Sequence, residues 1–168
     1  MFIAVVTLVT LAIAAVAAAI DHRKGQIPNW LTLPALALAP LAYYQVYGVD
    51  GLTFSAIGLL ACGLLPYLMF RADAIGGGDV KLFAALGALN GVALGGEMLV
   101  LAFALGCAQA LLYLVWRRQL GRVLRNSGRI LVNAVLPVSK RKPIPTESLT
   151  ELRLGPAIFA AVAWVSLV

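Results

Sequence analysis

Charged side chains are scarce in this sequence. Of its 168 residues only 12% are charged, whereas 62% are hydrophobic, and the mean hydropathy is +0.95. Soluble globular proteins carry about 25% charged residues. The composition therefore excludes an ordinary soluble domain. It predicts an all-α, polytopic membrane protein that forms one membrane-embedded domain over residues 1–168.

Side chains that bind metals or act as nucleophiles are also few. The chain has a single histidine, His22, and two cysteines, Cys62 and Cys107, which lie in separate apolar runs. These residues cannot complete a zinc site, so we expect no metal and no cofactor, and both cysteines should be small, buried apolar side chains. A phosphate-binding loop is excluded because Lys81 is followed by Leu82 and not by Ser or Thr.

Long apolar runs, by contrast, are abundant. A helix needs about 20 apolar residues to cross the ~30 Å hydrocarbon core, so we expect about six transmembrane helices. Their predicted ranges are 1–20, 30–47, 52–70, 79–95, 98–116 and 154–168. Turns are expected at residues 48–51 and 95–97, and a loop at residues 71–78. The fourth run is short and rises only about 25 Å as a helix. Its first residue, Asp79, should therefore lie within the depth of the membrane, on the floor of a cavity.

Residues 117–136 combine arginine and apolar residues at helical spacing. Leucines and valines lie largely on one face, and the other face carries four arginines: Arg118, Arg122, Arg125 and Arg129. This pattern predicts one interfacial amphipathic helix, with its apolar face toward the membrane core. Its arginines, from Arg117 to Arg129, should bind the anionic headgroups of the lipid bilayer.

The positive charges are placed on one side of the predicted topology. All 13 Lys and Arg residues fall in residues 21–29, in residues 71–78 with the start of the next helix, and in residues 117–153. The positive-inside rule makes that side cytoplasmic and places the N- and C-termini in the periplasm. The same placement accounts for the net charge of +6 without a nucleic-acid partner.

Two aspartates lie on this cytoplasmic side at the ends of apolar helices. Asp21 closes the first, and Asp79 opens the fourth after three glycines, Gly76, Gly77 and Gly78, which should form an irregular loop. Two adjacent carboxyl groups can share one proton and act as general base and general acid in peptide hydrolysis. The helix dipoles predict that Asp79 is the base and Asp21 the acid.

A structural role for the two aspartates is the alternative. Asp21 is then a solvated residue after a helix, and Asp79 is a helix N-cap. The chain would in that case be a non-enzymatic membrane protein, such as a small transporter or assembly subunit.

The segments around the two aspartates carry a resemblance to a known family. Asp21 is followed by Ile27-Pro28-Asn29, and Asp79 lies in Gly76-Gly77-Gly78-Asp79-Val80-Lys81. Together they resemble the type IV prepilin peptidases, which belong to the GxGD membrane aspartic proteases. Leu154-Gly155-Pro156-Ala157 is similar to the start of that family's last helix.

The resemblance implies an aspartic endopeptidase that removes the basic leader from prepilin and pseudopilin-like substrates at the cytoplasmic face of the bacterial inner membrane. It implies Asp21 and Asp79 as catalytic residues, with a set of site-shaping residues: Pro28, Asn29, Gly76, Gly77, Gly78, Lys81, Gly155 and Pro156. The chain resembles the short form found with Flp (tight-adherence) pili. It has no paired CxxC segment, so methyltransferase activity is not expected, and the sequence does not indicate an oligomeric state.

Overall fold

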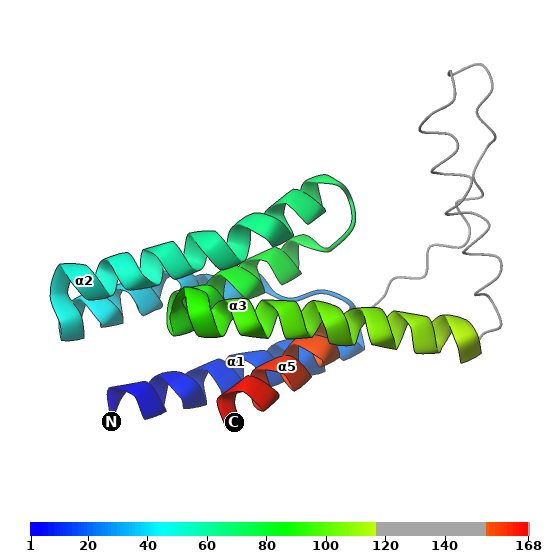
Figure 1. The fold of residues 1–168 in the computed structure, drawn as a ribbon, viewed down its shortest axis with the longest axis horizontal. Helices are drawn as coiled ribbons and strands as arrows, with labels where there is room; N and C mark the ends of the chain where they lie inside the picture. Colours follow the sequence, from blue (N-terminus) through cyan, green and yellow to red (C-terminus); the bar gives the residue numbers. More distant parts are fainter. Residues whose placement is uncertain (117–153, 168) are drawn as a thin grey trace, which may run out of the picture. The chain divides into compact units, whose positions relative to one another are not determined.

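The computed structural model describes residues 1–116 and 154–167, and these residues form helices without strands (Figure 1). The helices are α1 (Phe2–Lys24), α2 (Asn29–Arg71), α3 (Gly77–Trp116) and α5 (Gly155–Leu167). The predicted all-α class is confirmed for this part of the chain. The predicted interfacial helix over residues 117–136, with its arginines, lies outside the described residues.

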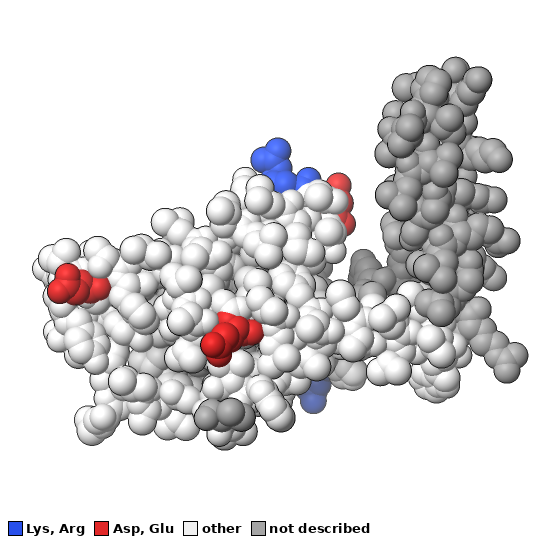
Figure 2. All heavy atoms as spheres, in the orientation of Figure 1, with Lys and Arg blue, Asp and Glu red and all other residues white. Residues whose placement is uncertain are grey.

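The helices are membrane-like in length and surface. α1, α2 and α3 are each long and apolar enough to cross a membrane, and α5 is a shorter apolar helix. Large apolar side chains such as Leu38, Leu60 and Leu112 point outward with 61%, 67% and 71% of their surface exposed. Figure 2 shows a face with very few charged residues. Such a surface is stable when hydrocarbon chains cover it.

Two glycines break the long helices. Gly48 in α2 has φ 65° and Gly91 in α3 has φ 73°, a left-handed backbone that glycine adopts without steric cost. After each break the chain folds back on itself, since Gly51 lies against Tyr43 and Gly95 lies against Gly87. The predicted turn at residues 48–51 is thus confirmed. The six-span count stays a prediction.

The turn predicted at residues 95–97 is wrong, because the reversal lies at Gly91. Gly91 has a positive φ, and a Cβ atom at this position would collide with the ring of Phe54. Only glycine fits there. Gly95 continues the helix after the break and packs on the sulfur of Cys62. The glycine pair at residues 95–96 predicts a turn because glycine is common in turns. In the structure, the close packing of Gly95 on Cys62 explains the glycine instead.

The break at Gly91 frees the backbone carbonyl groups of Ala88 and Leu89, two buried residues. Side-chain hydroxyl groups donate hydrogen bonds to these carbonyl groups. Ser55 Oγ donates to the carbonyl of Ala88 at 2.7 Å, and Tyr43 Oη donates to that of Leu89 at 2.7 Å. Asn90 Nδ2 adds a bond to Thr10 Oγ1 at 3.2 Å, which ties α3 to α1. The reversal in α3 is therefore held by polar side chains of α1 and α2.

Small side chains form the contact between α1 and α5. Ala14 and Ala17 of α1 are fully buried, as is Ala161 of α5. Small residues let helix backbones approach closely, which is the usual basis of helix packing in membranes. This contact holds the start of α5 beside the end of α1.

The described residues fall into two units, one with residues 1–106 and 154–167 and one with residues 107–116. All predicted site residues belong to the first unit. Cys62 in that unit is buried as predicted, whereas Cys107 is exposed, so its predicted burial is wrong. Hydropathy places a residue in the membrane but does not tell a lipid-facing side chain from a protein-facing one.

Candidate active site

Asp21 lies inside α1, in its last turn. The helix was predicted to end at residue 20, but it continues to Lys24 and ends at Gly25, whose N–H donates to the carbonyl of Asp21 at 2.8 Å. Only 6% of the Asp21 surface is exposed. The alternative that Asp21 is a solvated residue after a helix is therefore wrong. A buried carboxyl group requires partners, because its desolvation is otherwise unfavourable.

One partner of Asp21 is the first residue of α5. The backbone N–H of Gly155 donates to Asp21 Oδ2 at 2.9 Å. A Cβ atom at position 155 would lie 2.7 Å from both Cβ and Oδ2 of Asp21, so the contact requires glycine. Pro156 follows in the first turn of α5, where a missing N–H does not interrupt a helix.

Asp79 lies in the first turn of α3 and is partly buried. Its N–H donates to the carbonyl of Gly76 at 3.1 Å. The loop predicted for residues 71–78 ends at Gly76, because Gly77 and Gly78 already belong to the helix. The prediction that all three glycines form an irregular loop is therefore wrong for these two.

Lack of space explains why glycines begin α3. A Cβ at Gly78 would lie 3.0 Å from Ile27 Cβ and 3.2 Å from the Ile27 backbone, and one at Gly77 would lie 3.3 Å from the Phe70 ring. Neither glycine has a positive φ. Ile27 is thus a site-shaping residue that we did not single out from the sequence, although it lies within the motif that follows Asp21.

Lys81 connects the two motif segments. Its Nζ donates to Oδ1 of Asn29 at 2.7 Å, across 52 residues of sequence. Asn29 is the first residue of α2, and Pro28 before it is extended with φ −74°. Together with the contact between Ile27 and Gly78, this bond holds the Ile27-Pro28-Asn29 segment against the start of α3.

The two aspartates are close enough to interact electrostatically. Two such carboxyl groups repel each other when both are ionised, which favours a state with one proton for the pair. The helix dipoles no longer distinguish Asp79 as the base from Asp21 as the acid. The positive end of α5 lies at Asp21, just as the positive end of α3 lies at Asp79. The arrangement is suited to acid–base chemistry.

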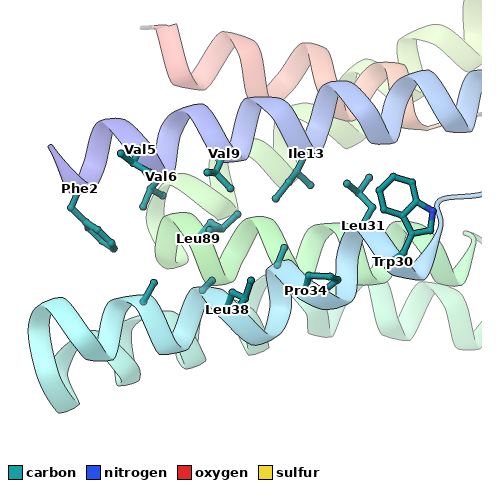
Figure 3. A pocket seen from close by; sticks show the side chains of 13 residues that line it. Phe2, Val5, Val6, Val9, Ile13, Trp30, Leu31, Pro34, Leu38 and Leu89 are labelled. Carbon is teal, nitrogen blue, oxygen red and sulfur yellow. The ribbon is translucent and has the colours of Figure 1, made fainter.

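An apolar pocket of about 460 Å³ lies between α1 and α2. Figure 3 shows Val9 and Ile13 of α1 and Leu31 of α2 among the side chains around it. Neither aspartate lines it. The pocket can accommodate hydrocarbon, but none of its lining residues carries a group that could activate water.

Comparison with known proteins agrees with the resemblance. The sequence model of the type IV leader peptidase family matches residues 8–115, which include Asp21 and Asp79. A prepilin leader peptidase/N-methyltransferase of Vibrio cholerae serotype O1 is 38% identical over 80 residues. That match covers 44% of this chain and 31% of the relative, so the chain spans about a third of the relative's length. No solved structure matches. The chain belongs to the type IV leader peptidase family.

Proposed function

We propose that this protein is a membrane aspartic endopeptidase that removes the short basic leader from prepilins of the Flp type. The observation that carries the proposal is the pairing of Asp21 and Asp79, which interact electrostatically at the ends of two apolar helices. Membership of a leader peptidase family supports the same reaction.

The proposed chemistry uses one carboxylate and one carboxyl group. The carboxylate takes a proton from water, and the water oxygen attacks the carbonyl carbon of the scissile peptide bond. The protonated partner donates to the carbonyl oxygen, which gives a tetrahedral intermediate. When that intermediate collapses, the proton taken from water passes to the leaving amine and the C–N bond breaks. One hydroxyl group of the intermediate returns its proton to the partner carboxylate, so the new chain end is a carboxylic acid. The pair returns to its starting state with one proton, and no covalent intermediate with the enzyme forms.

The proposed substrate suits a site at the membrane surface. A prepilin carries a basic leader followed by a long apolar helix, and that helix would lie in the bilayer beside the enzyme. Asp21 lies near the end of α1 and Asp79 near the start of α3, where these apolar helices meet loops. The scissile bond would then lie at the same height as the two aspartates.

The orientation and partners belong to the same proposal. The active site would face the cytoplasm of a bacterium from its inner membrane, with Arg117 to Arg129 on anionic headgroups and both termini in the periplasm. The name of the Vibrio relative includes N-methyltransferase. The expectation that this chain lacks methyl transfer remains a prediction, because the match covers less than a third of that relative.

The decisive experiment replaces each aspartate in turn. Co-expression with a prepilin of the same genome should produce loss of the leader, seen as a mobility shift on a gel. Asp21→Asn and Asp79→Asn should each lower the cleavage rate by about 100- to 10,000-fold, because amides cannot exchange the proton. Both variants should still accumulate in the membrane.

Asp73→Asn is the matched control. Asp73 is exposed and has φ 54°, a conformation that asparagine also tolerates, so this variant should cleave normally. Cleavage at the normal rate by Asp21→Asn or Asp79→Asn would show that the aspartates have a structural role.

A further inference from the structure

The first turn of α5 makes a contact that the acid–base scheme does not use. Gly155 N–H donates to Oδ2 of Asp21, and the two residues are 134 positions apart in the chain. The first N–H groups of any helix lack partners within that helix. Here one of them is directed at a carboxyl group in a buried position, where competing water is largely excluded.

The contact is held by rigid parts of the fold. α5 continues directly from this point, since Ile158 N–H donates to the carbonyl of Leu154 at 3.0 Å. Ala157 and Ile158 of the same turn are 4% and 0% exposed, in the core shared with α1. The amide of Gly155 therefore has little freedom to move away from Asp21.

The contact also excludes any other side chain at position 155. A Cβ there would lie 2.7 Å from Asp21 Cβ, 2.7 Å from Asp21 Oδ2 and 3.1 Å from Ala18 Cα. Contacts below 3.0 Å force atoms apart, and the atoms that must move belong to the aspartate itself. Even alanine would displace the carboxyl group or separate α5 from α1.

We propose that Gly155 is a positioning residue for the peptidase reaction. Its N–H holds Oδ2 of Asp21, and its missing side chain lets α5 approach, so that Oδ1 is left for the proton exchange of the proposed reaction. The inference rests on the proposed function. α5 is thereby part of the catalytic apparatus, and its start sets the orientation of one member of the aspartate pair.

An amide-to-ester exchange tests the hydrogen bond by itself. Cell-free translation into lipid nanodiscs can insert glycolic acid in place of Gly155, which removes the N–H and adds no bulk. The matched control is the ester at Ile158, which removes the bond from the first turn of α5 to Leu154 and leaves the bond to Asp21. Cleavage of a purified prepilin gives kcat and KM for each protein.

The ester at Gly155 should lower kcat about 10- to 100-fold and leave KM unchanged, as expected for loss of a buried hydrogen bond to a carboxyl group. The ester at Ile158 should retain kcat. Gly155→Ala should also lose activity, because it keeps the N–H but displaces Asp21. Gly96→Ala should not, because the space around Gly96 is open.

The outcomes separate the inference from the proposed function. Equal kcat for the unmodified protein and the Gly155 ester would overturn the positioning role and leave the peptidase assignment intact. Equal losses in the two esters would also overturn it, because both would then reflect damage to α5. Absence of prepilin cleavage by the unmodified protein would overturn the proposed function and the positioning role together.

Discussion

A single side-chain bond joins the two motif segments. Lys81 lies two positions after Asp79, and its bond to Asn29 links the start of α3 to the start of α2. The family resemblance marked both residues without giving them a role. The bond joins the first turns of α3 and α2, and the first turn of α3 contains Asp79. We therefore expect Lys81 and Asn29 to position that turn.

Lys81→Met should lower kcat/KM about 3- to 10-fold, because it keeps most of the side-chain bulk and removes one partly exposed hydrogen bond. Asn29→Ala should have a similar effect. The double variant should be no worse than either single variant, because both remove the same bond. Cleavage assays on the four proteins measure this, and strictly additive losses would contradict the role of the bond.

At the scale of helices, polar side chains stabilise the break in α3. Ser55→Ala would leave the carbonyl of Ala88 without its partner in an apolar interior. We expect the free energy of unfolding to fall by about 1–2 kcal/mol. Thr53→Ala is the control, because Thr53 Oγ1 binds the carbonyl of Asp50 at an exposed position. Thermal denaturation in detergent compares the variants, and equal midpoints for the two would argue against a stabilising role for Ser55.

Close backbone approach joins α2 and α3 at Gly58 and Gly87. A Cβ at either glycine would collide with the carbonyl oxygen of the other. Gly87→Ala should therefore destabilise the protein by about 1–3 kcal/mol through overpacking. Gly96→Ala lies in the same helix with open space around it and should change stability little. Comparable unfolding midpoints in detergent for the two alanine variants would refute the packing argument.

At the scale of the whole molecule, the distribution of positive charge predicts the orientation in the membrane. In a background that lacks Cys62 and Cys107, an impermeant thiol reagent added from the periplasm should label Asp50→Cys and Val92→Cys. It should not label Lys24→Cys. Val92 is the suitable reporter because the reversal lies at Gly91 and Val92 is 46% exposed. Labelling of position 24 alone would reverse the topology.

The sequence by itself determined the class of protein and singled out Asp21 and Asp79 as the candidate site residues. Low charge and long apolar runs require helices that satisfy their own backbone groups in lipid, so the all-α fold follows from composition. The turn at Gly48 and the prominence of Asp21 and Asp79 also follow from local features. These are glycine in a short break, and rare carboxyl groups at the edges of apolar runs.

Only the tertiary structure decided which surfaces meet. The helices are apolar on all sides, so hydropathy does not indicate which face packs on protein and which faces lipid. For this reason the sequence predicted a buried Cys107, whereas the side chain is exposed. The reversal at Gly91, the contact of Ile27 with Gly78 and the bond from Gly155 to Asp21 all depend on segments distant in sequence. Such contacts depend on the close fit of backbones at glycine and alanine, and a linear pattern of apolar residues carries no record of that fit.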